Sequence, residues 1–289
     1  MSAVEIGAVG RHARHLGGMP LGAAVIMCLV LLIAVFAPLL TPYDPVRGTL
    51  IDNLLPPFWV HGGSWRHPLG TDMLGRDVFS RLVYGARASV TVALIAICVA
   101  GTVGTIIGVV GGYLGGWADI LVMRIVDLML SMPLLLMAFV FAFVWGPSFT
   151  NVIIVLVLFL WAQYARQVRG EVLSVRERDF VSLARVAGAS RIRIMLRHIF
   201  PNVVNTLIVL AMLQVGRVIL LEASLSFLGV GLPPPQPAWG LMVADGRGML
   251  HSAWWISVAP GVAIILTIIS LNLFGDWLRD VLDPKLKQV

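Results

Sequence analysis

The sequence predicts an all-helical protein that crosses a membrane six times. Of its 289 residues, 58% are hydrophobic and only 12% are charged, whereas ordinary soluble domains carry about 25% charged residues. The apolar residues form long runs, each close to the roughly 20 residues that a helix needs to cross the hydrocarbon core. Lipid cannot satisfy open backbone groups and no alternating barrel pattern is present, so the spans must be helices.

Six stretches have the length and composition of membrane spans. The uncharged stretch from Leu128 to Ala165 is too long for one helix, and the turn Trp145–Asn151 (WGPSFTN) divides it. We expect the spans near Leu21–Leu40, Ser89–Gly112, Ile120–Val144, Asn151–Gln167, Val203–Leu221 and Trp254–Phe274.

These spans define the predicted organisation of the chain. We expect a cytoplasmic tail (1–20), a first span (21–40), an extracytoplasmic loop (41–88), a core of five spans (89–276) and a cytoplasmic tail (277–289). Within the core we expect a cytoplasmic loop (168–202) and an extracytoplasmic re-entrant loop (229–253). The proline run of the second loop does not fit a regular spanning helix.

The distribution of arginine predicts the orientation. Cytoplasmic segments of membrane proteins carry an excess of Lys and Arg, and the segment Arg166–Arg197 has eight arginines against three acids. Six spans place this segment, the basic N-terminal tail and the C-terminal DPKLKQV on one side, so we expect both termini in the cytoplasm. The net charge of +6 is explained in this way, and no nucleic-acid partner is expected.

The second span and the stretch before it each have a pattern that predicts which surface they contact. Ala96, Ala100, Gly104, Gly108, Gly112 and Gly116 form a smooth stripe at every fourth residue, which suits close packing either within this chain or against a second membrane subunit. The preceding stretch Arg76–Ala86 has apolar residues on one side and Arg76, Asp77 and Arg81 on another. It is interpreted as an amphipathic helix on the outer membrane surface, which either anchors the chain in lipid or serves as a docking platform.

The charged segment Arg166–Arg197 must lie outside the hydrocarbon, because each central Arg costs roughly 2.5–3.5 kcal/mol there. It divides into a helix over Phe180–Ala187, a C-terminal cap at Gly188 and a second helix capped by Ser190. In the second helix, four apolar residues have the spacing of one helical face: Ile192, Met195, Leu196 and Ile199. Pro201 is expected to mark the turn into the fifth span. The segment is either a basic loop on anionic lipid or a docking element for a cytosolic partner.

Few ionisable residues lie within the spans. Arg124 and Asp127 stand three residues apart and are expected to form a local ion pair. Arg217 and Glu222 lie toward the outer end of the fifth span. Because intramembrane charges often mark a substrate path, Asp127, Arg217 and Glu222 are the candidates for the translocation path.

Catalytic motifs are absent from the sequence. A phosphate-binding G-x-x-x-x-G-K-[ST] loop needs a lysine, and the two lysines, Lys285 and Lys287, lie at the C-terminus. No H-E-x-x-H or G-x-S-x-G motif is present. We expect no catalytic residue, metal or cofactor on this chain.

Four motifs in order carry a resemblance to a known family. ARVAGASRIRIMLRHIFPN is similar to the cytoplasmic loop of ABC importer permeases, with the pattern E-A-A-x-x-x-G-x9-I-x-L-P. Gly188, Pro201 and Ala184 match that pattern, whereas Ser182 stands at the usual Glu and Leu183 at the first Ala. His67–Val90, Asp127–Ala138 and Glu222–Gly240 narrow the resemblance to the C-type permeases of dipeptide, oligopeptide and nickel importers.

The resemblance implies a type I ABC importer permease in the bacterial cytoplasmic membrane. Its partners would be a B-type permease, two cytosolic ATP-binding subunits that carry ATP and Mg, and an extracytoplasmic binding protein. The family's coupling helix would correspond to ten residues of the cytoplasmic loop: Ser182, Leu183, Ala184, Arg185, Ala187, Gly188, Ala189, Ser190, Arg191 and Arg193. Candidates for docking the binding protein are Arg76, Asp77, Arg81, Pro234, Gln236 and Trp239.

The substrate has several candidates. Related permeases handle dipeptides, longer peptides, nickel complexes, glutathione or haem, and we expect di- or oligopeptides. A stand-alone secondary transporter is the rival function, but it predicts midplane carboxylates and broken helices in paired halves.

Overall fold

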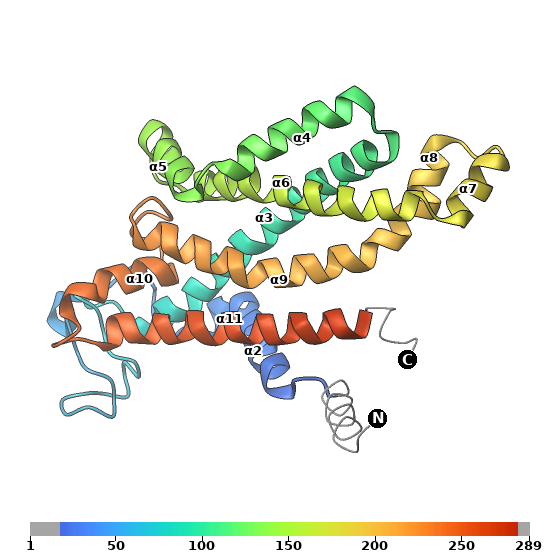
Figure 1. Cartoon of the computed structure of the whole chain (residues 1–289). Coiled ribbons are helices and arrows are strands. Elements are labelled where there is room, and N and C mark those ends of the chain that lie inside the picture. The colour runs from blue at the N-terminus through green and yellow to red at the C-terminus, as the bar shows by residue number, and fades with distance from the viewer. Residues whose placement is uncertain (1–17, 283–289) are drawn as a thin grey trace, which may run out of the picture.

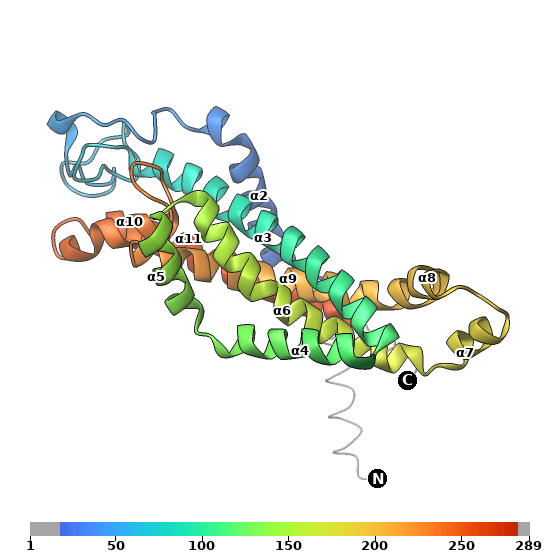
Figure 2. The same ribbon diagram turned by 90° about the horizontal axis from the view of Figure 1, so that it is seen from above.

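The computed structural model describes residues 18–282, and these form a bundle of long helices (Figures 1 and 2). Five helices are long and apolar enough to cross a membrane: α2 (Leu21–Leu40), α3 (Val78–Leu114), α6 (Phe149–Arg176), the continuous helix Arg191–Phe227, and α11 (Trp255–Leu282). A sixth span is the bent pair α4 (Gly116–Ser131) and α5 (Leu134–Trp145). Most of the predicted N-terminal tail and both lysines lie outside the described residues.

The stripe of small residues packs within this chain, against α6. A Cβ on Gly104 would lie 2.5 Å from the carbonyl oxygen of Trp161, and one on Gly108 would lie 2.8 Å from that of Ala165. The first of the two packing alternatives is therefore the observed one over most of the stripe. Gly116 is the exception, because a Cβ there would have no atom within 4 Å.

The expected third span is not one straight helix. α4 and α5 meet at an angle of 85°, and Met132 between them has extended backbone torsions (φ −81°, ψ 127°). Pro133 follows directly, and proline disfavours the helical conformation of the preceding residue. The break therefore lies at Met132–Pro133, inside an apolar run whose hydropathy alone suggested continuity.

The predicted surface helix at Arg76–Ala86 is wrong as a separate element. From Val78 onward its residues form the first turns of α3, which contains 37 residues and has Asp77 as its N-cap. At 1.5 Å per residue this helix is about 55 Å long, so it extends beyond a hydrocarbon core of about 30 Å. Its charged side faces the interior of the chain: Arg76, Asp77 and Arg81 are all buried.

Pro201 does not mark a turn, which corrects the expectation for the fifth span. The helix runs from α8 (Arg191–Ile194) through a π-helical segment (η2, Met195–Ile199) into α9 (Phe200–Phe227). The Phe200 N–H donates to the carbonyl of Met195, five residues earlier. The wider π turn accommodates Pro201, which has no N–H and would clash with a regular helical carbonyl.

The two ends of the bundle carry different elements (Figure 1). One end carries α7 (Asp179–Val186) and α8. The other carries α10 (Trp239–Gly246), the 3-10 turns η1 (Leu50–Asp52) and η3 (Arg247–Met249), and the segment 41–77, which we call the outer loop. α11 (Trp255–Leu282) continues into the segment 277–289 that we expect to be the cytoplasmic tail.

Candidate functional site

The α7–α8 unit is a helix, a glycine cap and a second helix, as the sequence predicts. Two hydrogen bonds form a Schellman cap at the end of α7. The Gly188 N–H donates to the Arg185 carbonyl (3.0 Å), and the Ala189 N–H donates to the Ala184 carbonyl (3.0 Å). Gly188 has φ +74°, a left-handed conformation that glycine adopts at little cost. The Ser190 hydroxyl then accepts the Arg193 N–H and caps α8.

Apolar side chains fasten this unit to the ends of the spans. Val181, Ile194 and Ile199 are buried in one cluster with Val172 of α6 and Val109 of α3. These contacts exclude water from the inner side of α7 and α8, and burial of each aliphatic side chain stabilises the attachment by about 1.5–3 kcal/mol. The unit is therefore part of the folded bundle.

The outer side of the unit exposes apolar residues. Val186 is 87% exposed, Leu183 68% and Ile192 66%. One expectation is corrected here: Ile192 and Ile199 do not share a face, because Ile199 is fully buried. The π-helical segment changes the angular spacing after Ile194, so the buried pair is Ile194 and Ile199, five residues apart.

Most of the predicted coupling residues lie on this exposed side. Eight are exposed and two, Ala184 and Ala189, are half-buried; the exposed ones are Ser182, Leu183, Arg185, Ala187, Gly188, Ser190, Arg191 and Arg193. A Cβ on Gly188 would have no atom of the chain within 4 Å. We call this exposed side the α7–α8 surface, and its apolar and small residues rimmed by arginine suit contact with another protein.

The translocation-path candidates do not form one site. The expected Arg124–Asp127 pair is not formed, and Asp127 instead pairs with Arg166 of α6. Arg217 lies over the ring of Phe159 and donates to the Gln163 side chain (3.3 Å).

Glu222 is enclosed within the chain and does not meet Arg217. Its carboxylate accepts hydrogen bonds from the hydroxyls of Ser89 (2.7 Å) and Ser226 (2.8 Å), and it is fully buried. This geometry links α3 to α9. The path role stays a prediction for Asp127 and Arg217, whose side chains are exposed.

At the α10 end, the docking candidates Arg76 and Arg81 belong to a buried ion-pair network, whereas the third charged candidate, Asp77, contacts His67 instead. Arg76 Nε lies 2.7 Å from Asp72 Oδ2, and Arg81 Nε lies 3.5 Å from the same oxygen. Both arginines also reach Asp245 Oδ2 of α10, at 3.7 and 3.5 Å. Burial raises the pKa of the Asp245 carboxyl, and the guanidiniums of Arg81 and Arg76 oppose that shift. The network balances two cations against two anions and ties the outer loop, α3 and α10 together.

The remaining docking candidates divide by exposure. Trp239 is buried and its Nε1 donates to the Leu82 carbonyl (2.9 Å), whereas Pro234 and Gln236 are exposed. Sequence reasoning missed Asp72 and Asp245 as partners of the arginines. It also missed the pairing of Asp119 with Arg169 between α4 and α6, at 2.6 Å. Asp72 stands only four residues before Arg76, but no local pattern connects Arg81 with Asp245 or Asp119 with Arg169.

A family model of binding-protein-dependent transport system inner membrane components matches residues 104–288. The chain belongs to this family. It is therefore a multi-pass inner membrane component of a binding-protein-dependent transport system. The matched region includes the α7–α8 surface and α10 and excludes the outer loop.

Curated relatives cover the outer loop as well. The chain is similar to the dipeptide transport system permease protein DppC of Escherichia coli K12, with 46% identity over 91% of this chain and 88% of the relative. The di/tripeptide transport system permease protein DppC of Pseudomonas aeruginosa is 41% identical, over 92% of this chain and 88% of the relative. The glutathione transport system permease protein GsiD of Escherichia coli O6:K15:H31 is also 41% identical, over 93% and 87%.

Proposed function

We propose that this inner membrane component is the C-type permease subunit of an ABC importer that moves di- and oligopeptides into the cytoplasm. Two relatives of more than 40% identity are named for dipeptide and di/tripeptide transport, which supports this substrate class. The structural observation that carries the proposal is the α7–α8 surface, an exposed apolar patch on a unit that is firmly packed into the bundle.

The proposal assigns the energy source to partners. Two cytosolic ATP-binding subunits would carry ATP and Mg, and one of them would receive the α7–α8 surface in a cleft. A B-type permease would complete the path, and an extracytoplasmic binding protein would deliver the peptide. Closure of the ATP-binding subunits would move the α7–α8 unit, and the buried contacts of Val181 and Ile194 would pass that movement to the spans.

Gly188→Arg tests the docking role. A Cβ at Gly188 would have no atom of this chain within 4 Å, so beyond the strain of its left-handed backbone the main effect of a long side chain there should be on a partner. We expect Gly188→Arg to abolish labelled dipeptide uptake in cells while the chain stays in the membrane.

Gly188→Asn is the matched control. Asparagine tolerates the left-handed backbone of Gly188 and adds no long cation, so it should retain most of the uptake. Normal uptake by Gly188→Arg together with normal recovery of ATP-binding subunits would refute the docking role.

A glutathione permease is the second candidate, because one relative of 41% identity has that name. Glutathione is itself a modified tripeptide, so competition separates the two substrates. Excess dialanine should suppress uptake of labelled dipeptide far more strongly than glutathione does. The reverse order would assign the chain to glutathione, and nickel or haem complexes should compete with neither.

A secondary transporter is distinguished by its energy source. Uptake by the proposed importer stops when the partner ATP-binding subunits are disabled, even if the ion gradient is intact. Unchanged uptake in such cells would overturn the proposal.

A further inference from the structure

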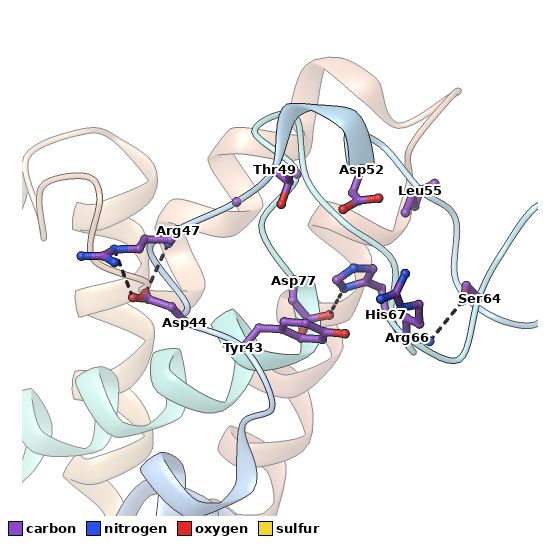
Figure 3. A pocket seen from close by; sticks show the side chains of 12 residues that line it. Tyr43, Asp44, Arg47, Thr49, Asp52, Leu55, Ser64, Arg66, His67 and Asp77 are labelled. Carbon is purple, nitrogen blue, oxygen red and sulfur yellow. Dashed lines mark hydrogen bonds and ion pairs between the residues drawn. The ribbon is translucent and has the colours of Figure 1, made fainter.

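A polar pocket of about 580 Å³ opens in the outer loop (Figure 3). The outer loop lies at the α10 end of the bundle, at the opposite end from α7 and α8 (Figure 1). The wall of the pocket is built where two stretches of the loop cross, one containing Gly48 and the other Gly75. A Cβ on Gly48 would clash with the carbonyl of Leu74, and a Cβ on Gly75 would clash with that of Thr49. Only glycine permits this close approach.

Hydrogen bonds fix the pocket to the spans. The Thr71 hydroxyl accepts the Leu55 N–H (2.8 Å), and the Thr71 carbonyl accepts Trp255 Nε1 of α11 (3.0 Å). Asp77 caps α3 by accepting the N–H of Ser80 (2.7 Å). The pocket is therefore a formed cavity on the outer ends of α3 and α11.

The charges that line the pocket are mixed, and most of them are already paired. Asp77 contacts His67 Nδ1 at 3.0 Å, and Asp44 lies 3.6 Å from Arg47 Nε. Two groups remain: among residues 18–282, the Asp52 carboxylate and the Arg66 guanidinium form no hydrogen bond or ion pair. Figure 3 shows both side chains at the pocket. The pocket thus offers one unpaired anion and one unpaired cation.

We propose that this pocket binds a small zwitterion of dipeptide size, with its ammonium on Asp52 and its carboxylate on Arg66. The volume lies within the roughly 300–1,000 Å³ of small-molecule sites, and a guanidinium binds carboxylate through paired hydrogen bonds. A purely anionic ligand would leave Asp52 without a partner, and a purely cationic ligand would leave Arg66 without one. The rings of Tyr43 and His67, whose centroids lie 4.7 Å apart with a tilt of 32° between the planes, supply an apolar face for a side chain of the ligand.

The ligand class follows from the charges of the pocket and does not depend on the proposed transport function. Binding is measured by titration calorimetry on the full chain in lipid nanodiscs, so an uptake assay is not needed. The probes are Ala-Ala, N-acetyl-Ala-Ala, which lacks the ammonium, and Ala-Ala amide, which lacks the carboxylate.

Each variant should affect one end of the ligand. Asp52→Asn should weaken Ala-Ala binding by about tenfold or more, the effect of one charge-assisted hydrogen bond, and should leave N-acetyl-Ala-Ala binding unchanged. Arg66→Gln should weaken Ala-Ala similarly and leave the amide unchanged. Arg47→Gln is the control, because Arg47 is already paired with Asp44, and it should change Ala-Ala binding by less than about threefold.

The pattern across variants and probes decides the proposal. Ala-Ala binding that survives both Asp52→Asn and Arg66→Gln places the ligand elsewhere and overturns it. Equal losses for all three probes would also overturn it, since they would report a damaged fold. An absence of Ala-Ala binding to the unmodified chain has the same consequence.

Discussion

The α10 end of the bundle buries a network of charged side chains, whereas the α7–α8 unit at the other end exposes apolar ones. At the α10 end, polar and charged groups are enclosed: Arg81 is 1% exposed and contacts the carboxylates of Asp72 and of the distant Asp245. At the α7–α8 end, apolar groups are left open: Val186 is 87% exposed. Removing one partner of a buried ion-pair network leaves an uncompensated charge inside the chain and destabilises its fold, whereas exposed apolar side chains gain burial only when a partner covers them. The comparison teaches that substitutions at the two ends should damage different properties.

The largest effect on stability is expected at Arg81. Arg81→Met leaves Asp72 and Asp245 short of one buried cation, and breaking such a pair typically costs about 3–5 kcal/mol. We expect a marked fall in the thermal unfolding temperature of the purified chain in detergent. Arg191→Met, which removes an exposed arginine at the opposite end, should leave that temperature nearly unchanged. Equal stability of the two variants would remove the distinction between the ends.

An intermediate effect is expected in the middle of the bundle, where α3 meets α6. A Cβ at Gly104 would lie 2.5 Å from both the Trp161 carbonyl oxygen and Tyr164 Cβ, so Gly104→Ala should cost about 1–3 kcal/mol through overpacking. Thermal unfolding in detergent checks this. On the same helix, Gly101→Ala brings its Cβ no closer than 3.6 Å to Tyr164, and it should be neutral or slightly stabilising. The prediction fails if Gly101→Ala is the more damaging of the two.

The smallest effect on stability is expected at the α7–α8 surface. Val186→Ser should change the free energy of unfolding by less than about 0.5 kcal/mol, because an exposed side chain has few contacts to lose, yet it should reduce recovery of ATP-binding subunits in co-purification. Val181→Ser is the matched contrast, since Val181 is fully buried in the same helix and its loss should destabilise the chain by about 1–3 kcal/mol. If Val186→Ser lowered stability as much as Val181→Ser, the surface would be part of the core.

Features that depend on neighbouring residues could be predicted from the sequence. The long apolar runs gave the helical bundle, and the Gly188 cap and the Ser190 cap were predicted because each is set within one turn of helix. The Met132–Pro133 break had a local signal too, but the continuous hydropathy on both sides concealed it. Pro201 predicted a turn that is not formed, because the π-helical segment before it accommodates proline within a continuous helix.

Features that depend on distant residues could not be predicted. Arg76, which precedes α3, and Arg81 in its first turns have the charge pattern of a water-facing surface, and nothing nearby shows that Asp245, more than 160 residues later, lies against them. The same limit applies to Asp127, whose partner proved to be Arg166 and not the neighbouring Arg124. The attraction between charges depends on their distance in space, and folding brings together residues that no local sequence pattern connects.

The uninterrupted path of the helix through Pro201 has a mechanical consequence. From Arg191 to Phe227 the chain is a single rod of 37 residues, about 55 Å long at 1.5 Å per residue. Because the helix is continuous, we expect a displacement of Arg191 to be transmitted along it toward Phe227. At that far end the Leu232 N–H donates to the Ser226 hydroxyl (3.2 Å), so the proline-containing loop would follow the movement.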